Sequence, residues 1–204
     1  MTQGLAILIP AAGASSRMRG RDKLIEEVEG RPLLALLAGR ARAVTDTVIV
    51  TLPEPPGARG AALAALDVTC VALPDARQGM AASLRAGVAA LPPGIRGLMI
   101  LPADMPEIRQ EDMQRLADAF AKAPEAIWQG AAEDGTPGHP VLFPADCLPA
   151  IAAVTGDTGA REVLRAQAHR VRRLALPGRR ALTDLDTPED WARWRAQRAA
   201  DRTD

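Results

Sequence analysis

The stretch LAILIPAAGASSRMRGRDK, residues 5–23, contains the signals that decide the fold of this 204-residue chain. Its apolar run at 5–9 is partly β-branched and ends at Pro10, a pattern typical of a buried strand. The small residues that follow, Gly13 among them, are typical of a loop at the end of such a strand. We therefore expect residues 5–9 to form the first strand of a parallel sheet.

Strand and helix patterns alternate along the rest of the chain. Strands are expected at 47–52, 68–73, 97–101 and 171–176, weaker strands at 126–129 and 141–143, and helices at 32–42, 58–66, 80–91, 111–123, 162–169 and 188–200. This alternation predicts an α/β fold with a doubly wound, mostly parallel sheet flanked by helices. No repeat, low-complexity tract or linker divides residues 1–204, so we expect a single domain. Ligands of such a sheet bind beyond the carboxyl ends of its strands.

Composition narrows the class of protein. The 25 basic and 25 acidic residues balance, so no overall field favours nucleic acid or an anionic membrane, and any anion site must be local. Cys70 and Cys147 are too few for a disulfide framework. No apolar run approaches the roughly 20 residues that span a bilayer, and no secretory signal opens the chain. We expect a cytoplasmic protein that binds neither nucleic acid nor membrane.

The loop after the first strand has the chemistry of a phosphate cradle. Small residues let the backbone approach a polyphosphate, and backbone N–H groups, Arg17 and Lys23 can meet its negative oxygens. The loop matches neither G-x-x-x-x-G-K-[ST] nor G-x-G-x-x-G. The expected nucleotide contacts are Ala11, Ala12, Gly13, Ala14, Ser15, Arg17 and Lys23. The alternative is an ordinary turn of small residues with solvated arginines.

Acidic residues follow two later apolar segments. Asp104 stands just beyond the expected strand at 97–101, and Mg²⁺ usually takes one or two protein carboxylates together with phosphate oxygens and water. Asp184 and Asp186 lie two residues apart, so both side chains share one face of an extended chain. The pattern favours a Mg²⁺ site built from Asp104 with Asp184 or Asp186, between which the sequence does not choose. The alternative for Asp104 is a solvated turn cap.

Taken together, these motifs resemble those of the MobA-like nucleotidyltransferases. The family pattern is an apolar strand, A-A-G-x-S-x-R-M, a glycine and D-K-L, and residues 11–18 and 22–24 match it. The resemblance implies a Rossmann-like domain of the nucleotide-diphospho-sugar transferase type. It also implies that Arg17, Lys23 and Asp104 are catalytic, the first two by neutralising the triphosphate. The chain departs from the pattern at Arg19, which stands between Met18 and the expected glycine.

A further match, G-M-x-x-S-L-x-x-G at 79–87, implies contacts to the nucleoside. In the family this segment lies against the base and ribose, so Gly79, Met80 and Ser83 are the candidate residues here. The alternative is a helix that follows a glycine and packs on the sheet through small residues.

Two segments further along resemble the loops that shape the acceptor pocket in the family. They read G-H-P-x-x-F at 138–143 and G-D-x-G-A-R at 156–161. The resemblance implies that His139, Asp157 and Arg161 orient an anionic pterin phosphate. The alternatives are a His139 that hydrogen-bonds loop backbone and a helix start capped by Asp157.

The resemblance finally implies a reaction. The spellings A-A-G and G-H-P are typical of molybdenum cofactor cytidylyltransferases, whereas the guanylyltransferases typically carry A-G-G. The expected Mg²⁺-dependent reaction transfers CMP from CTP, favoured over GTP, to the terminal phosphate of molybdopterin and releases pyrophosphate. Two alternatives stay open: another small phosphorylated acceptor, and a non-catalytic nucleotide-binding partner of a molybdoenzyme or its maturation factor.

Overall fold

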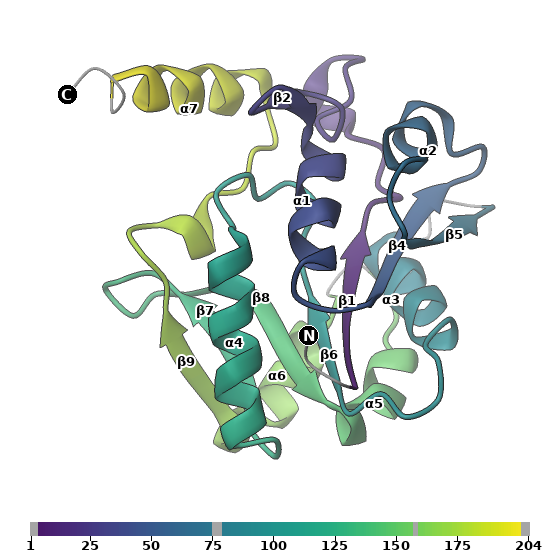
Figure 1. Ribbon diagram of the computed structural model, residues 1–204, viewed down its shortest axis with the longest axis vertical. Helices are drawn as coiled ribbons and strands as arrows, with labels where there is room; N and C mark the ends of the chain where they lie inside the picture. Colours follow the sequence, from purple (N-terminus) through teal and green to yellow (C-terminus); the bar gives the residue numbers. More distant parts are fainter. Residues whose placement is uncertain (1–3, 75–78, 157–158, 201–204) are drawn as a thin grey trace.

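A seven-stranded sheet forms the centre of the computed structural model, which describes residues 4–74, 79–156 and 159–200 (Figure 1). In spatial order its strands are β5 (Thr69–Leu73), β4 (Thr47–Pro53), β1 (Leu5–Pro10), β6 (Gly97–Ile100), β8 (Pro137–Pro144), β7 (Ile127–Ala131) and β9 (Val171–Ala175). β1 runs parallel to β4 and β6, β4 to β5, and β7 to β9, whereas β8 is antiparallel to β6 and β7. The expected doubly wound, mostly parallel α/β sheet is confirmed.

Helices cover both faces of this sheet. They are α1 (Leu33–Arg42), α2 (Gly57–Leu63), α3 (Gly79–Ala89), α4 (Gln110–Lys122), α5 (Leu148–Ala152), α6 (Arg161–Ala166) and α7 (Pro188–Ala200). In Figure 1, α1 and α4 lie in front of the sheet. Within the described residues, none of these helices has both the length and the apolar character needed to cross a membrane.

Alternate residues of β1 build two separate hydrophobic cores. Leu5, Ile7 and Ile9 join the core that includes residues of α1, α4 and α7, while Ala6 and Leu8 join the core with α3, α5 and α6. A strand buried on both faces needs apolar residues at every position, which is why the run at 5–9 has no polar alternation.

The sequence patterns did not predict several short elements. The hairpin β2 (Glu27–Val28) and β3 (Arg31–Pro32) and the five-residue helix α5 were not predicted, because segments this short show no periodicity. The helix expected at 162–169 ends at Ala166 as α6, and a 3₁₀ turn at Ala168–Arg170 follows it. The helix expected at 58–66 is α2.

Backbone hydrogen bonds join two pairs of distant segments at the carboxyl ends of the central strands. The N–H of Ala11 donates to the carbonyl of Thr51 at 2.9 Å and ties the loop after β1 to β4. The N–H of Leu185 donates to the carbonyl of Asp104 at 3.0 Å. The segment that precedes α7 therefore lies against the loop after β6, at the edge of the sheet where ligands are expected.

Candidate active site

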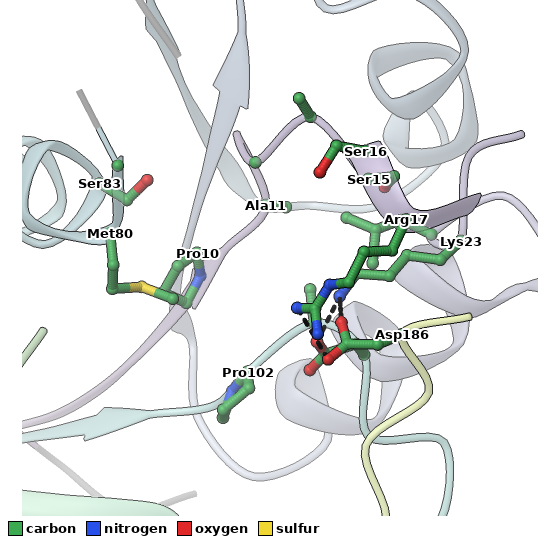
Figure 2. A pocket seen from close by; sticks show the side chains of 16 residues that line it. Pro10, Ala11, Ser15, Ser16, Arg17, Lys23, Met80, Ser83, Pro102 and Asp186 are labelled. Atoms are coloured by element: carbon green, nitrogen blue, oxygen red, sulfur yellow. Dashed lines mark hydrogen bonds and ion pairs between the residues drawn. The ribbon is translucent and has the colours of Figure 1, made fainter. Parts of the chain in front are cut away.

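A cleft of about 270 Å³ opens at this edge, and we call it the first cleft (Figure 2). Eleven of the residues proposed from the sequence line it: Ala11, Gly13, Ala14, Ser15, Arg17, Lys23, Gly79, Met80, Ser83, Asp104 and Asp186. Ala12 does not; it is buried beneath the loop in a small cluster with Leu73 and Ala82. The loop after β1 and the start of α3 thus face one shared space, as the sequence motifs predicted.

Lys23 is the centre of an ionic cluster in the first cleft. Its Nζ donates to Asp104 Oδ2 at 2.5 Å and to Asp186 Oδ1 at 2.7 Å. Arg17 Nη2 lies 2.9 Å from Asp186 Oδ2, and Figure 2 shows both cations pointing toward this carboxylate. Burial alone would lower the pKa of Lys23, but the charges and hydrogen bonds of Asp104 and Asp186 raise it on balance. Lys23 is therefore a fixed positive charge at neutral pH.

Asp104 and Asp186 suit a divalent cation that also binds phosphate. The described residues contain no group of three His, Cys, Asp or Glu side chains that could hold a metal by themselves. Two carboxylates that both reach one ammonium can instead share one cation, and Mg²⁺ needs only one or two carboxylates when phosphate oxygens and water complete its shell. The donor set fits that ion.

Asp184, the other candidate metal ligand, lies in a neighbouring cleft. It does not line the first cleft, and no described residue forms an ion pair with its carboxylate. Burial raises the pKa of Asp184, and the negative charges of Asp104 and Asp186 raise it further. Three carboxylates therefore gather near Lys23, but Asp186 is the one that shares the ammonium with Asp104.

The extra residue Arg19 is accommodated by left-handed backbone. Arg19 has a φ of +53°, and Gly20 follows with a φ of +87°. A non-glycine residue in this region costs roughly 1 kcal/mol. The Arg19 guanidinium forms a 2.6 Å ion pair with Glu189 in the first turn of α7. The turn after Met18 thus keeps its glycine at Gly20, one position later than in the common form of the motif.

Arg59 holds the loop after β1 in shape, and the sequence motifs did not reveal it. Its side chain is only 6% exposed and forms a two-pronged ion pair with Asp22, with Nε–Oδ2 at 2.7 Å and Nη2–Oδ1 at 2.8 Å. Its Nη1 donates to the carbonyls of Ala11 and Gly13 at 2.6 and 2.8 Å, and its Nη2 to Ser15 Oγ at 3.1 Å. No pattern distinguishes this arginine from the many others in the chain.

A second cleft of about 770 Å³ adjoins the first and shares Arg17, Met80 and Asp104 with it. His139, Arg161 and Asp184 line the second cleft, as do Gln129 of β7 and Arg173 of β9. The structure therefore brings two of the three proposed acceptor residues together and adds Arg173, which no motif had indicated. Asp157, the third, lies outside the described residues.

His139 presents a neutral ring to the second cleft. Burial lowers its pKa, Asp104 acts in the opposite direction, and Arg161 lowers it further. Its Nδ1 is buried and has no hydrogen-bond partner among the described residues. The preceding Gly138 lies so close to η5 (Arg180–Leu182) that a Cβ would overlap the backbone carbonyl of Ala181. The Nδ1 atom of His139 therefore does not make, with any described residue, the hydrogen bond to loop backbone that the alternative interpretation expected.

The fold and the two adjoining clefts define a class: α/β proteins that bind a nucleotide at the carboxyl edge of a parallel sheet. Residues 7–171 match the model of the MobA-like NTP transferase domain. The chain belongs to this family and is a nucleotidyltransferase, as the resemblance of its motifs implied.

Relatives with assigned names point to molybdenum cofactor biosynthesis. The chain is 29% identical over 191 residues to a probable molybdenum cofactor guanylyltransferase of Nostoc, covering 92% of this chain and 89% of the relative. It is 35% identical over 126 residues to the molybdenum cofactor guanylyltransferase of Pseudomonas aeruginosa PAO1, covering 60% of each chain.

Solved structures agree on the fold. Rv0371c of Mycobacterium tuberculosis superposes with a TM-score of 0.81 at 28% identity, covering 95% of this chain and 98% of that one. The same protein in complex with manganese gives 0.77 at 28% identity, covering 93% and 97%. A CMP:2-keto-3-deoxy-manno-octonic acid synthetase complexed with CTP gives 0.74 at 17% identity over 97% and 99%, a likeness of fold alone.

Proposed function

We propose that this nucleotidyltransferase transfers a nucleoside monophosphate, CMP from CTP, to the terminal phosphate of molybdopterin and releases pyrophosphate. One observation carries the proposal: the two clefts meet at Arg17 and Asp104. A donor in the first cleft and an acceptor in the second would therefore meet beside a guanidinium and a carboxylate. Bringing two substrates together in this way, with charges already in place, supplies most of what phosphoryl transfer requires.

The first cleft provides the groups that the donor needs. Arg17 and Lys23 neutralise the triphosphate and the departing pyrophosphate, and the backbone of the loop after β1 lies against the phosphates. Asp104 and Asp186 hold Mg²⁺, which when bound polarises the phosphate oxygens and withdraws charge from the reacting phosphorus. Met80 and Ser83 lie across the cleft from Arg17 and Lys23 (Figure 2). Together with Gly79, which also lines the cleft, they contact the base and ribose.

The second cleft provides the groups that an anionic acceptor needs. Arg161 and Arg173 offer guanidinium groups to a phosphate, and the lowered pKa of His139 leaves its ring uncharged and able to hydrogen-bond a pterin. Asp184 lies in the same cleft, where burial and the negative charges of Asp104 and Asp186 raise its pKa. Molybdopterin, with an anionic phosphate at the end of a ring system, fits this combination.

The identity of the nucleotide rests on two short motifs. Ala11-Ala12-Gly13 and Gly138-His139-Pro140 favour CTP. The names of the relatives favour GTP as the second candidate, since those from Nostoc and Pseudomonas are called guanylyltransferases. Cytoplasmic location, the single-domain division and a molybdoenzyme as the receiving partner stay predictions.

The experiment compares CTP with GTP at equal concentration, using purified protein, molybdopterin and Mg²⁺. Pyrophosphate release and the nucleotidylated pterin are both measured. We expect CTP to be the preferred donor, and a preference for GTP would overturn the choice of nucleotide while leaving the reaction class intact. Transfer to a different small phosphate, without transfer to molybdopterin, would overturn the choice of acceptor.

A pair of variants separates catalysis from mere binding. Asp104→Asn removes the carboxylate at the junction of the two clefts and should abolish pyrophosphate release. Asp118→Asn is the matched control, because Asp118 lies exposed on α4 and its side chain accepts a 2.8 Å hydrogen bond from Gln114, its one side-chain partner among the described residues. Full turnover in Asp104→Asn would show that the metal and junction roles are assigned to the wrong residue.

A further inference from the structure

A third cleft, of about 430 Å³, shares none of the described lining residues with the two clefts described above. Five of its ten lining residues are arginines, so we call it the arginine cleft: Arg40, Arg109, Arg179, Arg180 and Arg198. They come from four places in the chain, the end of α1, the start of α4, the turn after β9 and the end of α7. The tertiary fold, rather than one basic segment, gathers these charges.

The arginine cleft has more positive than negative charge. Among the described residues, its lining includes two carboxylates, Glu29 and Glu107, against five guanidinium groups. In a chain with a formal net charge of zero, such a surplus is a local departure from the average. A concave wall concentrates the field of these charges and favours an anion.

Three of the arginines are already held in position. Arg40 and Arg198 both pair with Glu29, at 3.0 and 3.1 Å, and Arg180 lies 3.3 Å from Asp112. The Nη1 of Arg40 also donates to the backbone carbonyls of Pro106 and Ile108 at 2.9 and 2.7 Å. Guanidinium groups fixed in this way lose little conformational entropy when a ligand arrives.

The other two arginines have hydrogen-bond donors available for a ligand. Arg109 and Arg179 are exposed, and neither side chain forms an ion pair with a described residue, although the charge of Arg179 is close enough to Asp134 to help lower the pKa of that carboxyl. Burial lowers the pKa of Arg40, and the positive charges of Arg109 and Arg198 add to this against the opposing effect of Glu29. Like charges thus face one another across the cleft without enough carboxylates to separate them.

We propose that the arginine cleft binds a small anion that carries two or more phosphate groups. Guanidinium groups match phosphate oxygens in two-pronged hydrogen bonds, and Arg109 and Arg179 have donors available. The volume lies in the range of small-molecule sites, roughly 300–1,000 Å³, and accommodates a chain of phosphates. The proposal does not depend on which nucleotide or acceptor the two other clefts bind.

The test is calorimetric titration of the full-length protein with inorganic tripolyphosphate in the presence of a metal chelator. The wild type should bind at two sites, one in the first cleft and one in the arginine cleft. Arg109→Ser/Arg179→Ser should weaken binding at the arginine cleft by about tenfold or more, or about 1.4 kcal/mol. Arg17→Ser should weaken binding in the first cleft and leave binding at the arginine cleft unchanged.

A control variant separates a site from general electrostatic attraction. Arg115→Ser/Arg193→Ser removes the same charge from exposed positions on α4 and α7 that do not line the cleft, and should retain both sites. Trp194 gives a local signal, since its Nε1 donates to Glu107 at 3.0 Å and Arg198 lies 5.0 Å from its ring centroid. The intrinsic tryptophan fluorescence, to which Trp194 contributes together with Trp128 and Trp191, should change on titration in the wild type and the control variant.

Two results would overturn the proposal. One is a single site in the wild type that Arg17→Ser removes, with intrinsic tryptophan fluorescence unchanged. The other is equal weakening in Arg109→Ser/Arg179→Ser and in Arg115→Ser/Arg193→Ser, which would indicate unspecific attraction to positive surface.

Discussion

Replacing Arg59 by methionine tests whether the loop after β1 is shaped by one buried guanidinium. Methionine retains much of the apolar stem of arginine but removes the charge and all five donors. The change leaves Asp22 without its partner and leaves the carbonyls of Ala11 and Gly13 without the donors they have in the folded protein. Since Lys23 follows Asp22 directly, the effect should reach the ionic cluster of the first cleft.

The expected loss of stability follows from burial. Removing one partner of a fully buried ion pair costs about 3–5 kcal/mol, but the Asp22 side chain is 33% exposed, so water screens the remaining charge and about 2 kcal/mol is expected. The two carbonyls that lose donors add about 1 kcal/mol together. A total of about 3 kcal/mol corresponds to a fall in Tm of about 6–12 °C for a chain of this length.

The assay combines thermal unfolding with nucleotide kinetics. Arg59→Met should lower Tm by the stated amount and raise KM for the nucleotide about tenfold or more, because Arg17 and Lys23 are no longer held for the phosphates. Arg59→Lys, which keeps the charge but loses the planar fork, should have a Tm and a KM between those of the wild type and Arg59→Met. Arg115→Met is the matched control, because Arg115 is exposed on α4, and it should change stability by no more than about 0.5 kcal/mol.

A double variant isolates the ion pair itself. Burial raises the pKa of Asp22, but hydrogen bonds from Arg59 and from the N–H of Leu24 lower it on balance, so the charged carboxylate is the stabilised form. Arg59→Met/Asp22→Asn removes the orphaned charge and should be more stable than Arg59→Met alone. The role of Arg59 is refuted if Arg59→Met unfolds at the same temperature as Arg115→Met, or if the double variant Arg59→Met/Asp22→Asn is no more stable than Arg59→Met.

Three further predictions follow from individual residues. Lys23→Met removes the ammonium between Asp104 and Asp186, so calorimetry should detect weaker binding of the nucleotide but tighter binding of Mn²⁺ alone; weaker Mn²⁺ binding would contradict this. Burial lowers the pKa of His139, so its contribution to stability is complete above the unfolded value of 6.5 and is lost as the pH falls through the lower folded value. In urea unfolding, His139→Gln should therefore lose less stability than the wild type between pH 7 and pH 5, and equal losses would refute the prediction. Gly138→Ala places a Cβ against the carbonyl of Ala181 and should lower stability by about 1–3 kcal/mol in thermal unfolding. Gly39→Ala, with open space around its Cβ in α1, should instead raise stability by up to about 1 kcal/mol, because alanine is the better helix former.

The order of strands and helices could be predicted because each long element has its own periodicity. The uninterrupted apolar run of β1 reflects burial on both faces, and the positions that join the two cores alternate along it. The hairpin of β2 and β3 could not be predicted, since two residues per strand define no period. Its backbone conformation depends on residues such as Glu29 and Gly30, which both have positive φ.

The candidate site was predictable where its residues lie in short sequence motifs, and not where it depends on contacts between distant segments. Arg17 and Lys23 lie in the same motif, and the structure places both in the first cleft. The choice between Asp184 and Asp186 depends on which side chain reaches Lys23, a contact across more than 160 residues. Arg59 reaches the loop after β1 from the short helix α2, and Arg173 reaches the second cleft from the edge strand β9. Contacts of this kind follow from packing in three dimensions and have no local signature.

Lys23 connects the role implied by the family motif with the contacts in the structure. The motif assigns this lysine to the triphosphate, while its ammonium lies between Asp104 and Asp186. Without a cation there, two carboxylates so close together would repel each other strongly in the partly buried cleft. In the first cleft, two basic and two acidic side chains balance. A nucleotide that arrives with its metal ion would exchange these partners, with Lys23 moving to phosphate oxygens and the carboxylates to the metal. We infer that Lys23 stabilises the empty site and the loaded one in turn.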